Sequence, residues 1–178
     1  MRIITGAAKG RKLTAPKGGT RPMTGRARES LFSILSDRLA GAVVLDLFAG
    51  SGSLGLESLS RGAKDVVFVE RDRIAARILR ENVERVDLGG TVREQGVKPF
   101  LRSETDRYDL IFVDPPYGDD DDSVRSVLEL LDAVLATDGV VVLHRQARSV
   151  VELPDFLGTV DERRYGDAVI TMMERAEE

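Results

Sequence analysis

Apolar residues along the chain fall into short runs that alternate with amphipathic stretches of helical spacing. The runs predict buried strands at residues 43–48, 65–70, 91–95, 109–113 and 140–144. The stretches between them predict helices at residues 54–60, 72–86 and 124–135, with a short helix near Lys98. Strands that alternate with helices predict an α/β fold with a doubly wound, mostly parallel sheet. Two further extended segments, 159–165 and 168–173, predict an antiparallel hairpin at its C-terminal edge.

Two segments have the apolar spacing of helices that lie on a sheet. In the first, Thr24 is the expected N-cap, and the apolar positions are Ala27, Leu31, Ile34, Leu35 and Leu39. In the second, the expected inward-facing positions are Ile74, Ala75, Ile78, Leu79 and Val83. Prolines and glycines in residues 16–22 break the chain before the first helix. Ahead of them, a small hairpin is predicted from Ile3, Ile4 and Leu13, which flank Gly6 and Gly10.

The charge is distributed unevenly along the chain. The net charge is −4, but residues 1–30 contain eight basic side chains and one acidic, a net +7, and the remaining 148 residues carry −11. A basic segment on an acidic body is typical of nucleic-acid contact, because Lys and Arg displace counterions from phosphates. The alternative is a solvated, poorly ordered terminus. The predicted RNA-binding residues are Lys9, Arg11, Lys12, Arg21, Arg26 and Arg28.

We therefore divide the chain into a basic N-terminal extension, residues 1–40, and a catalytic body, residues 41–178.

The composition of the chain excludes several kinds of catalytic and metal-binding site. The chain has no Cys and a single His, which excludes disulfides, thiolate zinc sites and cysteine nucleophiles and argues against a multi-histidine site, so no metal is expected. The longest apolar runs are strand-sized and no signal-peptide core is present, so we expect a cytoplasmic protein without a membrane segment.

A glycine-rich turn follows the first predicted strand. Gly50, Gly52 and Gly55 have the G-x-G-x-x-G spacing of a nucleotide-binding turn, and Glu70 lies twenty residues beyond Gly50, where it can hold ribose hydroxyls. These residues alone fit NAD equally well. A carboxylate at Asp46, at the mouth of the turn, repels a pyrophosphate and attracts the ammonium and sulfonium of S-adenosylmethionine. The alternative is a purely structural turn in which Asp46 caps the helix. The predicted cofactor-binding residues are Asp46, Phe48, Gly50, Ser51, Gly52, Glu70, Arg71, Gly96 and Val97.

A second motif, Asp114-Pro115-Pro116-Tyr117, follows the strand predicted at residues 109–113. The prolines stiffen the loop and leave its carbonyl groups free, and Asp114 supplies an anionic acceptor. Together these groups can hold a planar exocyclic amine and direct its lone pair toward a methyl group. Tyr117 can stack on a base taken out of its helix or loop. We predict that these four residues are catalytic; an ordinary Pro-Pro turn is the alternative.

Three other features are given structural explanations. The acidic run 119–122 is expected to be a solvated loop and helix start rather than a metal site. His144, Met172 and Met173 are expected to pack or face solvent and are assigned no role. Tyr165-Gly166 predicts either a turn or a second wall of the substrate pocket.

The motifs taken together resemble a known family. The segments 46–52 and 114–117, with the basic segments 2–6, 10–13, 20–22 and 26–32, are similar to those of the RsmD family of bacterial 16S rRNA (guanine-N2) methyltransferases, which act at nucleotide 966. The resemblance covers nearly the whole chain. The two central motifs are shared with many amino-methyltransferases, including DNA adenine enzymes, whereas the basic segments single out this family.

The resemblance implies a Rossmann-like class I methyltransferase fold with a seven-stranded sheet, S-adenosylmethionine as methyl donor, and 16S rRNA or an assembling small ribosomal subunit as partner. It implies donor contacts for Asp46, Gly50 and Gly52, a ribose contact for Glu70, and guanine contacts for 114–117. A monomer is expected.

The chain also departs from the family pattern. Met23 and Gly25 stand where Thr and Asp are expected. Gln95-Gly96-Val97 replaces an acidic adenine ligand, so the adenine would rely on backbone and apolar contacts.

Three other functions remain open at this point. A DNA adenine N6-methyltransferase uses the same two motifs but usually adds a target-recognition region, for which 178 residues leave little room. A nicotinamide-dependent oxidoreductase shares the glycine spacing. A non-catalytic RNA-binding assembly factor would not need residues 114–117.

Overall fold

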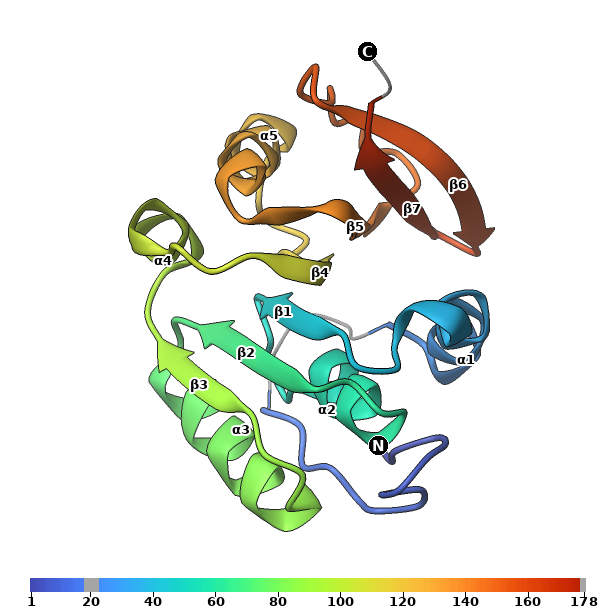
Figure 1. The fold of residues 1–178 in the computed structure, drawn as a ribbon, viewed down its shortest axis with the longest axis vertical. Helices are drawn as coiled ribbons and strands as arrows, with labels where there is room; N and C mark the ends of the chain where they lie inside the picture. The colour runs from blue at the N-terminus through green and yellow to red at the C-terminus, as the bar shows by residue number, and fades with distance from the viewer. Residues whose placement is uncertain (18–22, 177–178) are drawn as a thin grey trace.

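The computed structural model describes residues 1–17 and 23–176 and has one seven-stranded sheet in the order β3-β2-β1-β4-β5-β7-β6 (Figure 1). The strands are β1 (Val43–Leu47), β2 (Asp65–Glu70), β3 (Thr91–Glu94), β4 (Tyr108–Val113), β5 (Leu135–Gln146), β6 (Leu157–Tyr165) and β7 (Ala168–Arg175). The first five strands are parallel, and β7 pairs antiparallel with both β5 and β6. The predicted α/β class, mostly parallel sheet and C-terminal hairpin are confirmed.

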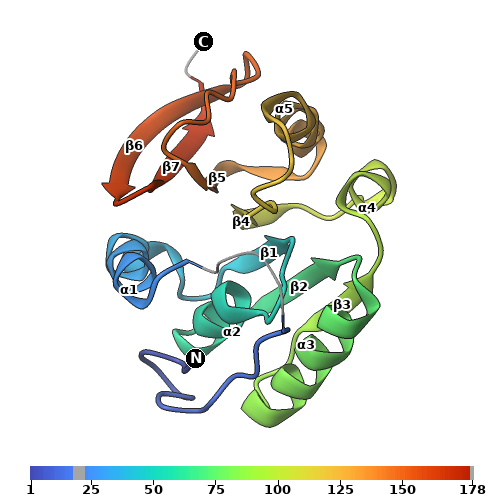
Figure 2. The same ribbon diagram turned by 180° about the vertical axis from the view of Figure 1, so that it is seen from behind.

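Helices cover both faces of the sheet (Figures 1 and 2). One face carries α1 (Gly25–Ile34), α2 (Ser53–Ser60) and α3 (Arg73–Val86), and the other carries α4 (Val97–Ser103) and α5 (Asp121–Leu130). Short 3-10 turns, η1 (Ser36–Arg38) and η2 (Leu131–Ala133), follow α1 and α5. Successive residues of a strand enter opposite layers: Phe112 packs with the α1–α3 side and Val113 with the α4–α5 side. This burial on both faces explains why the central strands are continuous apolar runs.

Polar side chains set the helix starts. The side chains of Thr24, Asp72 and Asp120 accept hydrogen bonds from backbone N–H groups at the N-termini of α1, α3 and α5, at 3.3, 2.8 and 2.7 Å. The acidic run therefore begins a helix, as predicted. The helix predicted at residues 124–135 is displaced: α5 starts at Asp121 and ends at Leu130, and β5 begins at Leu135. Apolar residues continue through η2 and into β5 because they fill the same core. The apolar pattern in the sequence therefore does not mark the end of α5.

Residues 2–12 form a small closed loop that lies against α2. A single antiparallel bridge joins Arg2 to Lys12, and Ile3 and Leu13 are buried in the core. The carboxylate of Glu57 in α2 accepts hydrogen bonds from the backbone N–H groups of residues 4–5, at 2.7 and 3.0 Å. The predicted hairpin is thus ordered rather than a solvated tail, although it has one bridge in place of a ladder. The division at residue 40 into extension and body stays a prediction.

Candidate active site

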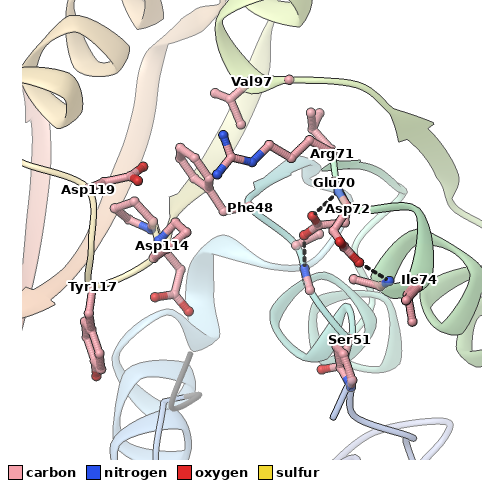
Figure 3. Close-up of a pocket in the computed structure, with 18 of the residues that line it drawn as sticks. Phe48, Ser51, Glu70, Arg71, Asp72, Ile74, Val97, Asp114, Tyr117 and Asp119 are labelled. Atoms are coloured by element: carbon pink, nitrogen blue, oxygen red, sulfur yellow. Dashed lines mark hydrogen bonds between the residues drawn. The ribbon is translucent and has the colours of Figure 1, made fainter. Parts of the chain in front are cut away.

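The order of the strands reverses between β1 and β4, so the chain leaves these neighbouring strands in opposite directions. Ligands of doubly wound sheets bind at this switch point, beside the carboxyl ends of the strands. A cavity of about 770 Å³ opens there (Figure 3). Its wall includes eleven of the residues predicted for the donor and acceptor sites: Phe48, Gly50, Ser51, Glu70, Arg71, Gly96, Val97, Asp114, Pro115, Pro116 and Tyr117. The glycine turn and the Asp-Pro-Pro-Tyr motif are therefore brought together in one cavity.

Asp46 lies behind the cavity wall instead of facing it. Its side chain is 1% exposed, and its Oδ2 accepts a hydrogen bond from the Gly55 N–H in the first turn of α2, at 2.9 Å. Burial raises the pKa of Asp46 well above its ordinary value, and the nearby carboxylates of Asp114 and Glu70 raise it further. Asp46 therefore caps α2 and supports the turn, the structural alternative, and its direct contact with the donor stays a prediction.

The helix cap made by Asp46 also bears on the kind of ligand the cavity accepts. In dinucleotide-binding folds a pyrophosphate binds the free N–H groups at the helix N-terminus after the glycine turn. Here Asp46 already accepts from the Gly55 N–H of that terminus. The Gly55 N–H is therefore not free to bind a pyrophosphate, which makes the site less suited to NAD.

The glycine turn depends on unusual backbone conformations. Gly52 has φ +78°, and a Cβ at this position would lie 2.3 Å from Leu79 Cδ1, so Gly52 serves the close approach of the turn to α3 rather than the cavity wall. Phe48 is also left-handed, at φ 58°. This conformation ends β1 one residue earlier than predicted and places Phe48 in the cavity wall.

Glu70, at the end of β2, joins the first two loops of the site. Its Oε2 accepts a hydrogen bond from the Gly50 N–H at 2.9 Å, and its Oε1 accepts from the Asp72 N–H at 2.8 Å (Figure 3). Each carboxylate oxygen has a further lone pair. Glu70 therefore holds the glycine turn in place and can still accept from two hydroxyl groups of a ligand in the cavity.

Asp114 is held by a residue to which the sequence analysis assigned no role. His144 Nδ1 lies 2.7 Å from Asp114 Oδ1, and the His144 side chain is 3% exposed. Val113 of β4 lies opposite Leu143 of β5 in the parallel register, so the next residues, Asp114 and His144, lie side by side. The expectation that His144 only packs or faces solvent is wrong. Its position at the end of a strand adjacent to the Asp-Pro-Pro-Tyr loop was a signal that could have found it.

The N-terminal segment also reaches the cavity, which the sequence analysis did not predict. Met1 and residues 15–17 line its wall. Ile74, expected on the inner face of α3, is 62% exposed and lines the cavity as well. In the first turn of α3, Ile74 therefore faces the cavity, whereas Ala75 beside it is buried.

The basic residues predicted to contact RNA differ in their surroundings. Arg28 is only 5% exposed and donates to the Arg2 carbonyl at 2.7 Å, so it anchors the N-terminal segment and is removed from the predicted RNA-binding set. Arg11 donates to the carbonyl groups of residues 85–86 at the C-terminus of α3. Lys9, Lys12 and Arg26 are exposed, and Arg21 lies outside the described residues.

The turn predicted at residues 165–166 is confirmed, whereas their role as a second wall of the substrate pocket stays a prediction. The chain turns there between β6 and β7, and both residues also line a second cavity. The Tyr165 hydroxyl donates to Ser30 Oγ at 2.6 Å, which connects the hairpin to α1.

Within the described residues, no group of three or more His, Cys, Asp or Glu side chains has a metal-binding arrangement, and no helix is long and apolar enough to cross a membrane.

Comparison with known proteins now gives the family. Residues 1–174 match the family described as Conserved hypothetical protein 95. The chain belongs to this family. It is 36% identical over 167 residues to the candidate rRNA methyltransferase YlbH of Bacillus subtilis, covering 89% of this chain and 88% of that protein.

One curated relative and one solved structure, both from Escherichia coli, extend the comparison. Ribosomal RNA small subunit methyltransferase D of strain K12 is 41% identical over 119 residues, which cover 66% of this chain and 60% of that protein. The solved structure of the candidate methyltransferase yhhF has a TM-score of 0.89 at 32% identity, covering 98% of this chain and 97% of that one. The resemblance to the RsmD family and the class I methyltransferase fold are thereby confirmed, and the oxidoreductase, DNA-methyltransferase and assembly-factor alternatives are not favoured.

Proposed function

We propose that this methyltransferase transfers a methyl group from S-adenosylmethionine to the exocyclic N2 of a guanine in 16S rRNA, at nucleotide 966 by analogy with its relatives. One observation carries the proposal: Asp114 to Tyr117 and the donor residues of the glycine turn line the same cavity. The names of the relatives supply the substrate, a ribosomal RNA of the small subunit. Free 16S rRNA or an assembling subunit is the partner, and we expect a cytoplasmic monomer.

The residues of the cavity fit S-adenosylmethionine. Glu70 can accept hydrogen bonds from ribose hydroxyls, and the carboxylates of Glu70 and Asp114 favour a cationic ligand. Phe48, Ile74 and Val97 offer apolar surface for an adenine ring, with Gly96 leaving room at the start of α4. This matches the lack of an acidic adenine ligand at residues 95–97. When bound, S-adenosylmethionine supplies an electrophilic methyl group.

The loop after β4 is suited to hold the acceptor amine. The Asp114 carboxylate and the carbonyl groups of the Pro-Pro segment can accept the two N–H groups of a planar amine. These bonds turn the nitrogen lone pair out of conjugation with the base and stabilise the positive charge that develops on nitrogen. His144 holds one oxygen of Asp114, so the other is available to the amine. Tyr117 provides a flat face on which the guanine can stack.

The exposed basic residues give the RNA contact a physical basis. Lys9 and Lys12 lie on the N-terminal loop and Arg26 on the first turn of α1, all exposed. These side chains can neutralise phosphates outside the cavity, which makes affinity for RNA depend on salt. We include Arg11 and Arg21 in this proposed set.

The deciding experiment uses small-subunit RNA and subunit particles that lack the modification. The purified protein should transfer labelled methyl groups from S-adenosylmethionine, and nucleoside mass spectrometry should find N2-methylguanosine at one position. Absence of that nucleoside from both substrates, or methylation of DNA adenine instead, would refute the proposal. Asp114→Ala should abolish turnover while donor binding measured by calorimetry persists; loss of both would place Asp114 in the donor site.

A further inference from the structure

A second cavity, of about 690 Å³, lies between the start of α1, the end of β5 and the turn that joins β6 to β7. These three segments are far apart in sequence but lie side by side in both ribbon views (Figures 1 and 2). The volume is within the range of about 300–1,000 Å³ that is typical of ligand sites. The described residues that line it are Met23, Thr24, Arg26, Ala27, Tyr117, His144, Gln146, Arg164, Tyr165, Gly166, Asp167 and Ala168.

The walls of this cavity are tied together by hydrogen bonds. The Tyr165 hydroxyl donates to Ser30 Oγ at 2.6 Å, which joins the hairpin turn to α1. The Ala147 N–H donates to the Asp167 carbonyl at 2.8 Å, which joins the same turn to the end of β5. These two bonds hold the hairpin turn against α1 and against the end of β5.

The second cavity adjoins the methyl-transfer site at Tyr117. Tyr117 lines both cavities, and it is the one described residue that does so. His144 lines the second cavity, while its Nδ1 bonds Asp114 in the wall of the first. The rings of Tyr117 and His144 are 6.3 Å apart. The two cavities are therefore near enough for neighbouring groups of one polymer to occupy them, with Tyr117 between.

The lining is chemically suited to an unstacked nucleotide. Tyr117 and Tyr165 are partly exposed and offer ring faces, and base–aromatic stacking tolerates any base. Two guanidinium groups are present. Arg164 donates through Nε to the Gly166 carbonyl at 3.1 Å, and its other N–H groups remain for a phosphate.

The charge of the lining favours an anion overall. Arg26 is exposed and, among the described residues, no acidic side chain pairs with it. Asp167 is the acidic residue of the lining, and its carboxylate can accept N–H groups from a base edge. Two guanidinium groups against one carboxylate leave the cavity net positive, as a sugar–phosphate backbone requires.

We propose that the second cavity binds the RNA nucleotide covalently adjacent to the acceptor guanosine. The base of that nucleotide stacks among the rings, and its phosphate lies beside Arg164 and Arg26. This inference rests on the proposed function, because it requires an RNA acceptor at Asp114. It makes the enzyme selective for an acceptor whose neighbour is unpaired, since a base inside a duplex cannot enter a cavity of this kind.

The first experiment compares two neighbouring arginines of β6. Arg164 lines the cavity, whereas Arg163 is bonded to Asp161 at 2.9 Å and does not line it. Arg164→Ala should raise the KM for RNA about threefold to tenfold and reduce the log–log salt slope by about 0.7, the value for one phosphate of a single strand. The donor Kd should be unchanged. Arg163→Ala is the matched control and should leave the KM and the slope at their wild-type values.

The second experiment uses the wild-type enzyme, so it does not depend on the folding of a variant. Substrate RNA is assembled by ligation with one abasic site, placed immediately 5′ or 3′ of the methylated guanosine. Stacking of one base contributes about 1–3 kcal/mol, so removal of the base that occupies the cavity should lower kcat/KM about fivefold to 150-fold. Removal of the base on the other side should have a smaller effect.

The outcomes separate the two proposals. Wild-type methylation of RNA with equal responses from Arg164→Ala and Arg163→Ala, together with tolerance of both abasic sites, would overturn the inference and leave the function standing. Absence of N2-methylguanosine with any RNA would overturn both. The inference would be supported if an abasic site at one position lowers kcat/KM for the wild type and lowers it less for the Arg164→Ala variant. The variant has already lost part of the same contact, so the two changes are not additive.

Discussion

The contact between His144 and Asp114 allows a sharp test of how the acceptor loop works. An ionised carboxylate can only accept, so His144 Nδ1 donates to Asp114 Oδ1 over their 2.7 Å separation. The His144→Leu variant fills similar space without a donor. We expect the Asp114 carboxylate to lose its orientation toward the amine, while the donor-binding loops after β1 and β2 remain as they are.

The expected magnitude follows from the kind of bond that is lost. A hydrogen bond to a charged group contributes about 1.5–3 kcal/mol. Because His144 is 3% exposed, water cannot readily replace it as a partner for Asp114 Oδ1. If this stabilisation acts in the transition state, kcat falls about tenfold to 150-fold, at about 1.36 kcal/mol for each factor of ten. The KM for S-adenosylmethionine should change little.

The matched variant is His144→Asn, whose side-chain amide can place an N–H near the position of Nδ1. Single-turnover methylation of small-subunit RNA measures the rate, calorimetry measures donor affinity, and thermal unfolding checks the fold. We expect Asn to recover most of the rate that Leu loses. Equal loss in both variants would indicate a packing role for His144, and a rate within twofold of wild type in the Leu variant would refute the reasoning.

Three further predictions concern the framework of the site. Burial raises the pKa of Asp46 above its ordinary 3.8, so the folded state holds a proton that the unfolded state releases. The free energy of unfolding of the wild type should therefore fall relative to that of Asp46→Asn as pH rises from 3.8 through the raised pKa. Urea unfolding at several pH values measures the two free energies, and their difference should grow with pH. Gly52→Ala should destabilise the protein more than Gly50→Ala. Both substitutions place Ala at positive φ, which costs about 1–2 kcal/mol, but only the Cβ at position 52 also overpacks, which adds about 1–3 kcal/mol. Urea unfolding measures the difference in the free energy of unfolding. Glu57→Ala removes the acceptor for residues 4–5, and hydrogen exchange should show at least about tenfold lower protection of those two amides, with the central strands unchanged.

Residue spacing along the chain was sufficient to predict the architecture and most of the site. Buried strands of a parallel sheet are continuous apolar runs, and helices on such a sheet show one apolar face, so both can be recognised locally. The motifs at 46–52 and 114–117 follow such runs directly. Because parallel strands end at the same edge of the sheet, they had to lie on one side of the molecule, and the structure brings them into one cavity.

The tertiary structure decided what each side chain faces. Whether Asp46 meets the ligand or caps α2 depends on which way the end of β1 points, and the contact made by His144 depends on the register of β4 with β5. In the sequence, Arg28 cannot be distinguished from the other basic residues of its segment. In the structure it lies on α1 and donates to the Arg2 carbonyl. Local patterns report the propensity and periodicity of one element, whereas burial and hydrogen-bond partners arise from contacts between residues distant in sequence. The sequence alone therefore determined the fold and the position of the two motifs at one edge of the sheet, and only the packed structure determined which residue holds Asp114 and which basic side chains are exposed.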